Sequence, residues 1–387
     1  MASKAANKLI KLGWIGAGGI NFGSLEGPWN HAVRMQKQNN VQFTAVVDPN
    51  VKAAQNRIEQ YQQGPYAKKW EGCQAFKDHQ SMLQSAAKPE GVIIGVPPAV
   101  HGSLDIAAKA MEVDIAKAGL HMLVEKPISM RPAEEVERLA QVLDQVADEK
   151  SLIIAVGYML RSSPAVVAAK RLMQEIGVTP ASIVGRYSCP YNNIAKPQWW
   201  DTQKSGGCIV EQATHFVDLM RYLSGGDIIQ GSIQAVAVGP DMPLKEMPAH
   251  PQAEHLVPME RRNNRATMAT FKMTTGAIAC LSHTLLLHGS DFFSAMDITG
   301  DGYHIIIHDP YQNPSLQVRR PFTNHYEQVH LNLDQDMYEN QFDGWLEAIR
   351  TGNKDAVKCH YHDAAQTYKA SWDITEASGA APPGTDP

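Results

Sequence analysis

The stretch Lys11-Leu12-Gly13-Trp14-Ile15-Gly16-Ala17-Gly18-Gly19-Ile20 decides how this chain begins to fold. An apolar run ends at Ile15, and small residues follow before the next helical pattern. Between a buried strand and a helix, small residues let backbone amides approach a pyrophosphate and leave the helix amino terminus aimed at it. We therefore predict a phosphate-binding turn of a dinucleotide site. The expected contacts come from Gly16, Gly18, Gly19 and Ile20.

This turn departs from the usual fingerprint at its third small position, which is occupied by Asn21. Residues 22–28 also delay the helix, so the turn is longer than average. The next predicted strand ends directly before Asp48, where a carboxylate can accept hydrogen bonds from ribose hydroxyls and would repel a 2′-phosphate. We therefore expect NAD as the cofactor, while Lys52 and Arg57 nearby keep NADP as an alternative.

The pattern up to about residue 156 alternates between strands and helices. Apolar runs predict strands at 9–15, 43–47, 91–96, 121–124 and 152–156, with helices at 29–38, 51–61, 101–118 and 132–148 between them. Uninterrupted apolar strands are typical of a parallel sheet that is buried on both faces. Residues 1–156 are therefore expected to form a doubly wound Rossmann domain of the α/β class.

Beyond residue 157 the pattern changes. Predicted strands lie at 183–188, 232–238, 265–273, 277–287, 294–299, 303–308 and 316–318, and predicted helices at 164–174, 336–350 and 362–377. This order is typical of an α+β domain with a large, mostly antiparallel open sheet, expected over 157–387. Residues 240–262 are rich in proline, histidine and charge and are expected to form an insertion loop.

Bulk composition excludes several classes of protein. A chain of 387 residues is long enough for two cores, and a formal charge of −5 without long charged runs argues against nucleic-acid or membrane-surface binding. The five cysteines are scattered and form no pair with metal-ligand spacing, so we expect reduced thiols and no metal. No signal core or spanning segment is apparent, which favours a cytoplasmic protein with a small polar substrate.

Landmarks in the same order along most of residues 11–225 resemble those of the glucose-fructose oxidoreductase and inositol dehydrogenase family, often called the Gfo/Idh/MocA family. They are Ile15-Gly16-Ala17-Gly18, Val47-Asp48, Val96-Pro97 with His101, Ala118-Gly119-Leu120-His121 leading into Glu125-Lys126-Pro127, Arg161 with Pro164, and Ser205-Gly206-Gly207 leading into Glu211, His215 and Asp218. The resemblance implies a Rossmann domain followed by a domain whose open sheet commonly mediates homodimers or homotetramers. It also implies an active site between the two domains.

The resemblance carries roles to several residues. Pro97, His101, Glu125 and Lys126 would contact the cofactor, and Lys126 would also reach the substrate, where its ammonium would stabilise an alkoxide or relay protons. The alternative for Lys126 is a solvated loop lysine. Family members generally have aspartate where this chain has Glu211, one methylene longer.

Oxidation of a secondary alcohol requires a base for the hydroxyl proton as the hydride leaves the same carbon. We predict that His215 is this base and that Glu211, four residues earlier on the same helical face, orients its ring. A purely structural Glu211–His215 pair is the alternative. Asp218 is expected either to contact residues of the site without contacting the substrate or to be a charge on the helix surface.

Four residues near these groups are expected to form the substrate wall. Aromatic rings stack on the CH-rich faces of sugars, and arginine donates forked hydrogen bonds to oxygens. The predicted wall residues, with His215, are Tyr158, Arg161, Trp199 and Trp200. Packing between domains is the alternative for the tryptophans. His283 and His288 either reach the pocket or lie on the sheet without contacting it.

These residues favour an NAD(P)-dependent oxidoreductase acting on a hydroxyl or ketone of a sugar, cyclitol or glycoside. Three alternatives stay open at this point. A glycoside hydrolase could oxidise transiently and recycle its NAD, and a reductase could act on imines, tetrapyrroles or dihydrodiols. A non-enzymatic regulator could use the same fold to sense dinucleotide, but it would not need Lys126 and His215.

Overall fold

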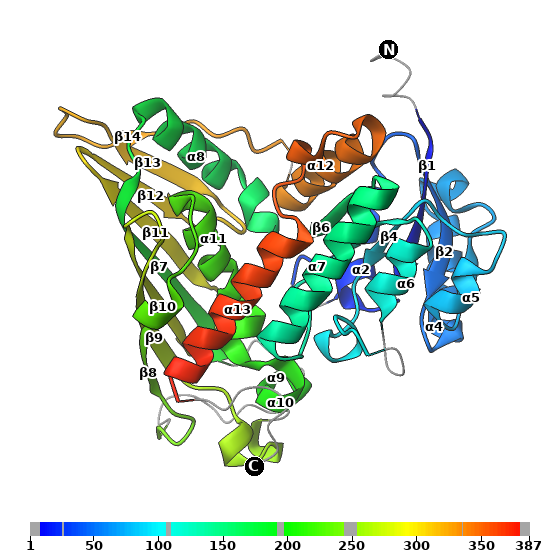
Figure 1. Cartoon of the computed structure of the whole chain (residues 1–387), viewed down its shortest axis with the longest axis horizontal. Coiled ribbons are helices and arrows are strands. Elements are labelled where there is room, and N and C mark those ends of the chain that lie inside the picture. Colours follow the sequence, from blue (N-terminus) through cyan, green and yellow to red (C-terminus); the bar gives the residue numbers. More distant parts are fainter. Residues whose placement is uncertain are drawn as a thin grey trace. The chain divides into compact units, whose positions relative to one another are not determined.

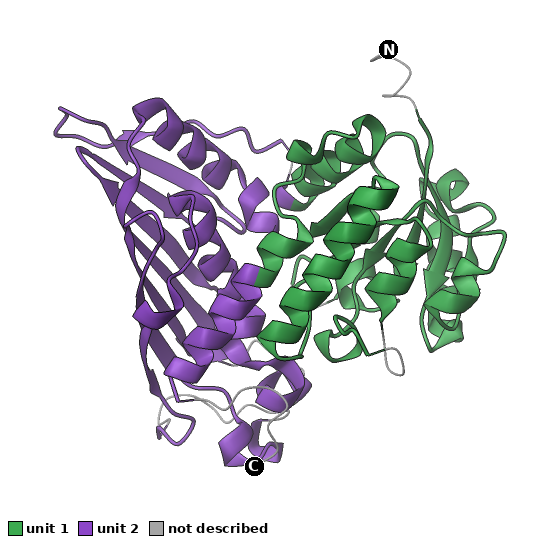
Figure 2. Cartoon of the chain, in the orientation of Figure 1, with its two compact units in different colours: residues 1–157, 338–365 green, residues 158–337, 366–387 purple. Residues whose placement is uncertain are grey.

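The computed structural model describes residues 8–24, 27–105, 110–191, 197–243, 254–334 and 336–379. The chain forms two compact units (Figure 2). Unit 1 comprises Met1–Gly157 and Tyr338–Ala365, and unit 2 comprises Tyr158–Met337 and Gln366–Pro387. The first division falls one residue from the expected boundary at 156. The return of Tyr338–Ala365 to unit 1 differs from the expectation that 157–387 form one continuous domain.

Unit 1 is built on a six-stranded parallel sheet, as predicted. Its strands are β1 (Ile10–Ile15), β2 (Val41–Val47), β3 (Gln74–Phe76), β4 (Gly91–Ile94), β5 (His121–Val124) and β6 (Ile154–Val156). The order β3-β2-β1-β4-β5-β6 is that of a dinucleotide-binding Rossmann sheet. All residues of β4 and β6 are buried, in accordance with their uninterrupted apolar sequences.

The helices of unit 1 differ from the predictions mainly where they are short. They are α2 (Gly19–Phe22), α3 (His31–Met35), α4 (Val51–Gln62), α5 (His79–Leu83), α6 (Met111–Lys117), α7 (Ala133–Lys150) and α12 (Met337–Thr351). Within the range 29–38, where one helix is expected, the structure has only the five-residue α3. Helix α2 was not predicted, because four residues are too few to show a helical period. The helix expected at 101–118 is limited to α6 among the described residues, since 106–109 lie outside them.

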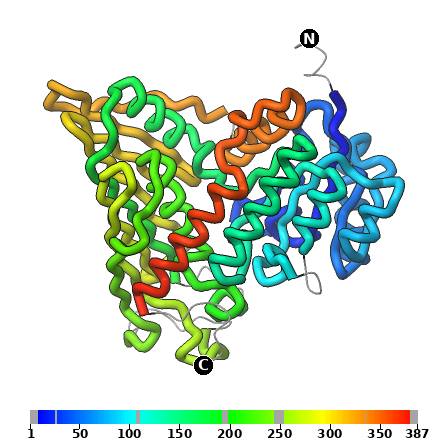
Figure 3. Tube along the Cα trace, viewed as in Figure 1, coloured from blue at the N-terminus to red at the C-terminus, as the bar shows by residue number. Residues whose placement is uncertain are grey.

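Helix α12 packs against the start of the chain within unit 1, where Figure 3 shows its orange trace near the blue amino-terminal segments. The Lys37 ammonium lies 2.6 Å from the Glu339 carboxylate, and Arg350 donates to the Asn39 carbonyl at 2.7 Å. The Arg34 guanidinium also lies over the Tyr338 ring, 4.5 Å from its centroid. These contacts explain why a segment more than 300 residues distant in sequence belongs to the Rossmann unit.

Unit 2 is built on an eight-stranded sheet whose order is β14-β13-β12-β11-β7-β10-β9-β8. Its strands are β7 (Pro180–Pro190), β8 (Gln234–Val238), β9 (Ala266–Lys272), β10 (Ile278–Leu287), β11 (Phe293–Gly300), β12 (Tyr303–His308), β13 (Ser315–Arg319) and β14 (Glu327–Gln328). Among the strand pairings of the described residues in this sheet, only β7–β10 is parallel, so the predicted mostly antiparallel sheet is confirmed.

Helices lie on one face of this sheet (Figure 1). They include α8 (Pro164–Ile176), which packs on β12 and β13, and α11 (Thr214–Ser224), which packs on β7 and β10. In β9 buried residues alternate with exposed ones, as expected for a sheet covered on one side. Three further α-helices are the short α9 (Pro197–Trp200) and α10 (Thr202–Ser205) and the long α13 (Tyr361–Ala377). Across the described residues, no helix is both long and apolar enough to span a membrane.

Candidate active site

The phosphate turn of unit 1 has the backbone that its glycines predict. Gly16 has a φ of 95°, and a Cβ added there would lie 2.5 Å from the Gly95 carbonyl oxygen, so a side chain is excluded. Gly18 directly precedes α2, and nothing lies within 4 Å of a Cβ added to it. The turn therefore leaves open space beside backbone amides, which fits a pyrophosphate.

The departure at Asn21 has a structural explanation. Its buried side-chain amide donates to the carbonyls of Ile15, at 3.1 Å, and Gly16, at 2.8 Å, and so holds the turn to the end of β1. A Cβ on Gly95 would lie 2.5 Å from Asn21 Oδ1. Asn21 therefore takes the place of the third small residue of the fingerprint, and Gly95, directly after β4, leaves the space that its side chain needs.

Asp48 lies where the predicted ribose partner should be, directly beyond β2. Its Oδ2 accepts from the amide of Ala17 in the phosphate turn at 2.9 Å, and its Oδ1 accepts from the Asn50 amide at 2.8 Å. The Arg57 Nε donates to the Ala17 carbonyl at 3.4 Å, so a guanidinium also lies beside the turn. The half-buried carboxylate fits an adenosine ribose. Lys52 is exposed on α4.

The next predicted cofactor residues, Pro97 and His101, follow β4. Pro97 is exposed and begins the turn. His101 is 3% exposed, and its Nδ1 lies 2.7 Å from Oε1 of the buried Glu112. The same carboxylate accepts from the Gly102 amide at 3.0 Å. Glu112 therefore fixes the ring of His101, and cofactor contact by Pro97 and His101 stays a prediction.

The Glu125 carboxylate is held by His31, a residue that was not predicted to belong to the site. Its Oε1 lies 2.7 Å from Nε2 of His31, which is fully buried at the start of α3. The carboxylate also fills the space beside Gly157, where an added Cβ would lie 2.6 Å from it. No local pattern marks His31 as its partner, because 94 residues separate them. Lys126 follows, half-buried, and the Lys126–Pro127 peptide bond is cis.

In unit 2 the helix that carries Glu211 and His215 begins irregularly. Gly206 and Gly207 both have left-handed φ angles, 83° and 82°, and a π-helix (Ile209–Ala213) precedes α11. Glu211 belongs to the π-helix and His215 to α11. The expectation that both residues lie on one face of a regular α-helix is therefore wrong, because a π turn inserts an additional residue.

His215 is 5% exposed and enclosed by aromatic rings of unit 2. The ring of Tyr158 lies 5.9 Å away and that of Tyr311 6.0 Å away, and both meet the imidazole edge-on. The Tyr158 hydroxyl lies 2.9 Å from Oγ1 of Thr214. Tyr158 thus helps to hold the helix that carries His215. Tyr311 was not predicted, because it lies in a loop with no local motif.

Arg161 and Asp218 form a buried ion pair. Nε of Arg161 donates to Oδ2 of Asp218 at 2.8 Å, and its Nη2 donates to Oδ1 at 2.6 Å. The side chains are 4% and 1% exposed. The surface position considered for Asp218 is therefore wrong, and substrate contact by Arg161 stays a prediction.

The two tryptophans of the predicted substrate wall are both buried, Trp200 completely. Their rings meet edge-on, and the ring of Trp200 also meets that of Tyr191. His288 is exposed, whereas His283 is fully buried with Nε2 3.1 Å from the Gln212 side-chain oxygen. Burial lowers the pKa of His283 to about 3, so this imidazole is neutral near pH 7.

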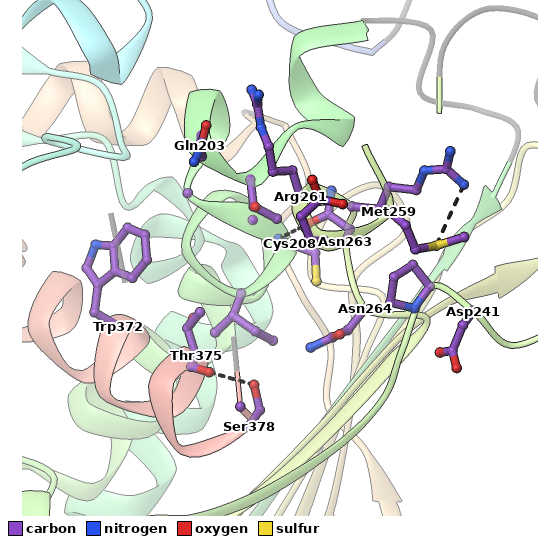
Figure 4. Close-up of a pocket in the computed structure, with 18 residues that line it drawn as sticks. Gln203, Cys208, Asp241, Met259, Arg261, Asn263, Asn264, Trp372, Thr375 and Ser378 are labelled. Atoms are coloured by element: carbon purple, nitrogen blue, oxygen red, sulfur yellow. Dashed lines mark hydrogen bonds between the residues drawn. The ribbon is translucent and has the colours of Figure 1, made fainter. Parts of the chain in front are cut away.

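A cavity of about 580 Å³ adjoins the Gly-Gly turn within unit 2 (Figure 4). Its lining includes Cys208, Asn263, Asn264, Trp372 and Thr375. The charged residues around it include two arginines and two acids, which leaves the lining close to neutral. No three His, Cys, Asp or Glu side chains gather as a metal site within the described part of the chain.

Comparison with known proteins agrees with this architecture. Residues 10–158 match the oxidoreductase family with an NAD-binding Rossmann fold, and residues 161–303 match the oxidoreductase C-terminal domain. Unit 1 is thus an NAD-binding Rossmann domain of an oxidoreductase. The chain belongs to the Gfo/Idh/MocA family of oxidoreductases, and its curated relatives include two proteins named as dehydrogenases.

Curated relatives match the chain over lengths from about half of it to nearly all of it. An uncharacterised protein of Schizosaccharomyces pombe is 33% identical over 378 residues, which span 95% of this chain and 91% of that protein. Levoglucosan dehydrogenase of Pseudarthrobacter phenanthrenivorans is 28% identical over 224 residues, 54% of this chain and 53% of that enzyme. A solved levoglucosan dehydrogenase in complex with NADH has the same fold, with a TM-score of 0.72, 18% identity and coverage of 96% and 97%.

Proposed function

We propose that this protein is an NAD(P)-dependent oxidoreductase that transfers a hydride between the nicotinamide and a secondary hydroxyl or ketone of a sugar, cyclitol or glycoside. The observation that carries the proposal is the buried His215, held edge-on by two tyrosine rings directly after a π turn that bears Glu211. A π turn of this kind is frequent at functional sites. The relatives named levoglucosan dehydrogenase and scyllo-inositol 2-dehydrogenase support the substrate class.

The proposed chemistry assigns one role to each of three side chains beside the bound nicotinamide. The nicotinamide, when bound, accepts or returns the hydride. His215 removes the hydroxyl proton, and the Glu211 carboxylate stabilises the imidazolium that results. Lys126, beyond β5 of the NAD-binding unit, stabilises the alkoxide with its ammonium.

The cofactor is proposed to be NAD rather than NADP. Asp48 places a carboxylate at the exit of β2, beside the turn amide of Ala17, where it would repel a 2′-phosphate. The Arg57 guanidinium beside the same turn could bind a 2′-phosphate, so NADP is tested alongside NAD. The substrate wall is proposed to include Tyr158, Arg161, Trp199 and Trp200.

A homo-oligomer is proposed to form through the open face of the unit 2 sheet. Val236 pairs with Met268 across β8 and β9, and Ile278 pairs with Lys272 across β10 and β9, so these side chains share one face. Val236, Met268 and Ile278 are 71%, 54% and 57% exposed. Large apolar side chains on a sheet face favour contact with a second copy.

The test is a cofactor-reduction screen with NAD and NADP against sugars, cyclitols and glycosides. Lys126→Ala and His215→Ala should each lower kcat/KM by about 10² to 10⁴. Lys150→Ala and His288→Ala serve as controls of the same residue types, because both side chains are exposed, whereas Lys126 is half-buried and His215 is buried. Equal slow background in the wild type and both variants on every substrate would exclude the proposal.

The same screen separates the competing functions. A glycoside hydrolase that recycles its NAD releases product without net NADH accumulation, so glycosides are followed by both product and NADH. Imine and dihydrodiol substrates are included as a separate panel. Saturable dinucleotide binding without turnover of any substrate would favour the non-enzymatic regulator.

A further inference from the structure

The helical segment that carries Glu211 is capped by a side chain far away in sequence. Asn263, 1% exposed, accepts from the Cys208 amide through Oδ1 at 2.7 Å (Figure 4). Its Nδ2 donates to the carbonyl of Trp199 at 3.0 Å. One buried amide therefore joins the start of the π-helix to the residue before Trp200.

The local sequence explains why an external cap is needed. The first amides of a helix have no intrahelical partner and are usually satisfied by a side chain just before the helix. Here the preceding residues are Gly206 and Gly207, which have no side chain. Gly207 is itself held by Ser205 Oγ, which accepts from its amide at 3.1 Å. The Cys208 amide is left to Asn263.

The segment that bears Asn263 is firmly attached on both sides. Arg261 forms an ion pair with the buried Asp201 through both Nε and Nη2, and Nε lies 3.1 Å from Oδ1. Arg265 donates to the buried Glu254 at 2.7 Å. An antiparallel bridge also links Asp201 with Arg262. Asn263 thus presents its amide from a fixed backbone.

We propose that Asn263 is a positioning residue that sets the register of the segment bearing Glu211 and His215. The inference rests on the proposed function. Glu211 follows the capped residue by three positions and lies in the π-helix Ile209–Ala213. A π turn has i→i+5 hydrogen bonds, whereas an α turn has i→i+4 hydrogen bonds. Conversion of the π turn to an α turn would therefore rotate Glu211 relative to His215. The cap at Cys208 holds the start of the segment and opposes this conversion.

The experiment compares Asn263→Ala and Asn263→Asp with Asn264→Ala, the adjacent and half-exposed amide of the same cavity lining. Asn263→Ala removes two buried hydrogen bonds and should lower kcat about tenfold or more. The Kd for NADH, measured by fluorescence, should change less than about twofold, because the Rossmann unit is untouched. Asn263→Asp keeps the acceptor for Cys208 and should retain more kcat than Asn263→Ala. Asn264→Ala should resemble the wild type.

Two readouts separate positioning from mere support of the fold. The apparent pKa of the catalytic base in the pH profile of kcat/KM should shift in Asn263→Ala. The reason is that the position of the Glu211 carboxylate relative to the His215 ring changes. Amide hydrogen exchange across 208–215 should accelerate in Asn263→Ala and not in Asn264→Ala. A lower Tm with unchanged kcat and pH profile would overturn the proposal.

The exchange measurement also keeps the two proposals distinguishable. If the wild type turns over no substrate, the proposed function fails, and exchange alone decides whether Asn263 caps the segment. Equal protection of 208–215 in the wild type and Asn263→Ala would then refute the cap. If Asn263→Ala does not fold, Asn263→Leu, which also lacks the acceptor for the Cys208 amide but fills the buried space, provides the same comparison. A kcat and an exchange rate equal to those of the wild type in Asn263→Leu would count against the proposal.

Discussion

Removal of the Asp218 carboxylate should be one of the most destabilising single changes in unit 2. Asp218→Ala leaves the Arg161 guanidinium buried and without the acceptor of its two short hydrogen bonds, 2.8 and 2.6 Å. The arginine side chain is only 4% exposed, so water cannot replace the carboxylate without a rearrangement. A buried charge that loses its partner typically costs about 3–5 kcal/mol.

Two neighbouring contacts affect the free-energy cost of Asp218→Ala. Thr367 Oγ1 donates to Asp218 Oδ1 at 3.0 Å, and this bond is lost as well. The guanidinium keeps its position 4.9 Å from the centre of the Tyr222 ring, which retains part of its stabilisation. We therefore expect a loss of about 3–5 kcal/mol in the free energy of unfolding for Asp218→Ala, and a similar loss for Arg161→Met.

The double variant Arg161→Met/Asp218→Leu removes both charges. Replacement of a buried ion pair by apolar groups is often neutral, so this variant should recover most of the lost stability. Urea unfolding followed by hydrogen exchange reports the stability of unit 2 separately from that of unit 1. KM for the identified substrate is measured in the same double variant, because an arginine that also contacts substrate would leave KM raised after stability returns.

A cost of less than about 1 kcal/mol for Asp218→Ala would contradict the role of the buried ion pair. A double variant as unstable as the sum of the single variants would also contradict it, since the loss would then not come from the separation of the two charges.

Two further predictions concern unit 1. Gly95→Ala places a methyl group 2.5 Å from Asn21 Oδ1, so it should cost about 1–3 kcal/mol and weaken NADH binding in a fluorescence titration. Asn21→Gly by itself loses the two hydrogen bonds to Ile15 and Gly16, so the double variant Gly95→Ala/Asn21→Gly should cost less than the sum of the two single variants. Strictly additive costs would contradict the steric explanation. Burial, with the charge of Lys8, lowers the pKa of His121 to about 4. The unfolded state binds a proton near pH 6.5 and the folded state does not, so stability present above pH 6.5 should fall by up to about 3 kcal/mol toward pH 4. His121→Asn should flatten this dependence in unfolding measurements between pH 7 and 4, and an unchanged slope would argue against the assignment.

Much of the fold could be predicted because it depends on local periodicity. The strand 121–124 was predicted with the observed bounds, and the apolar runs of β1, β2 and β4 indicated a sheet buried on both faces. Short elements such as α2 and β3 were missed, because a segment of three or four residues has no measurable period. The return of α12 to unit 1 depends on contacts with Lys37 and Arg34, which no local pattern records.

The sequence by itself determined the kinds of chemical groups at the candidate site and the elements that carry them: the glycine turn, Asp48 and Lys126 after strands, and Glu211 and His215 after a glycine pair. These are short-range properties of backbone conformation and hydrophobic pattern. Only the tertiary structure decided the partners of the buried polar side chains. It paired Glu125 with His31, Arg161 with Asp218, and Cys208 with Asn263. A buried polar group requires a partner, but its partner is chosen by proximity in space and not by distance along the chain.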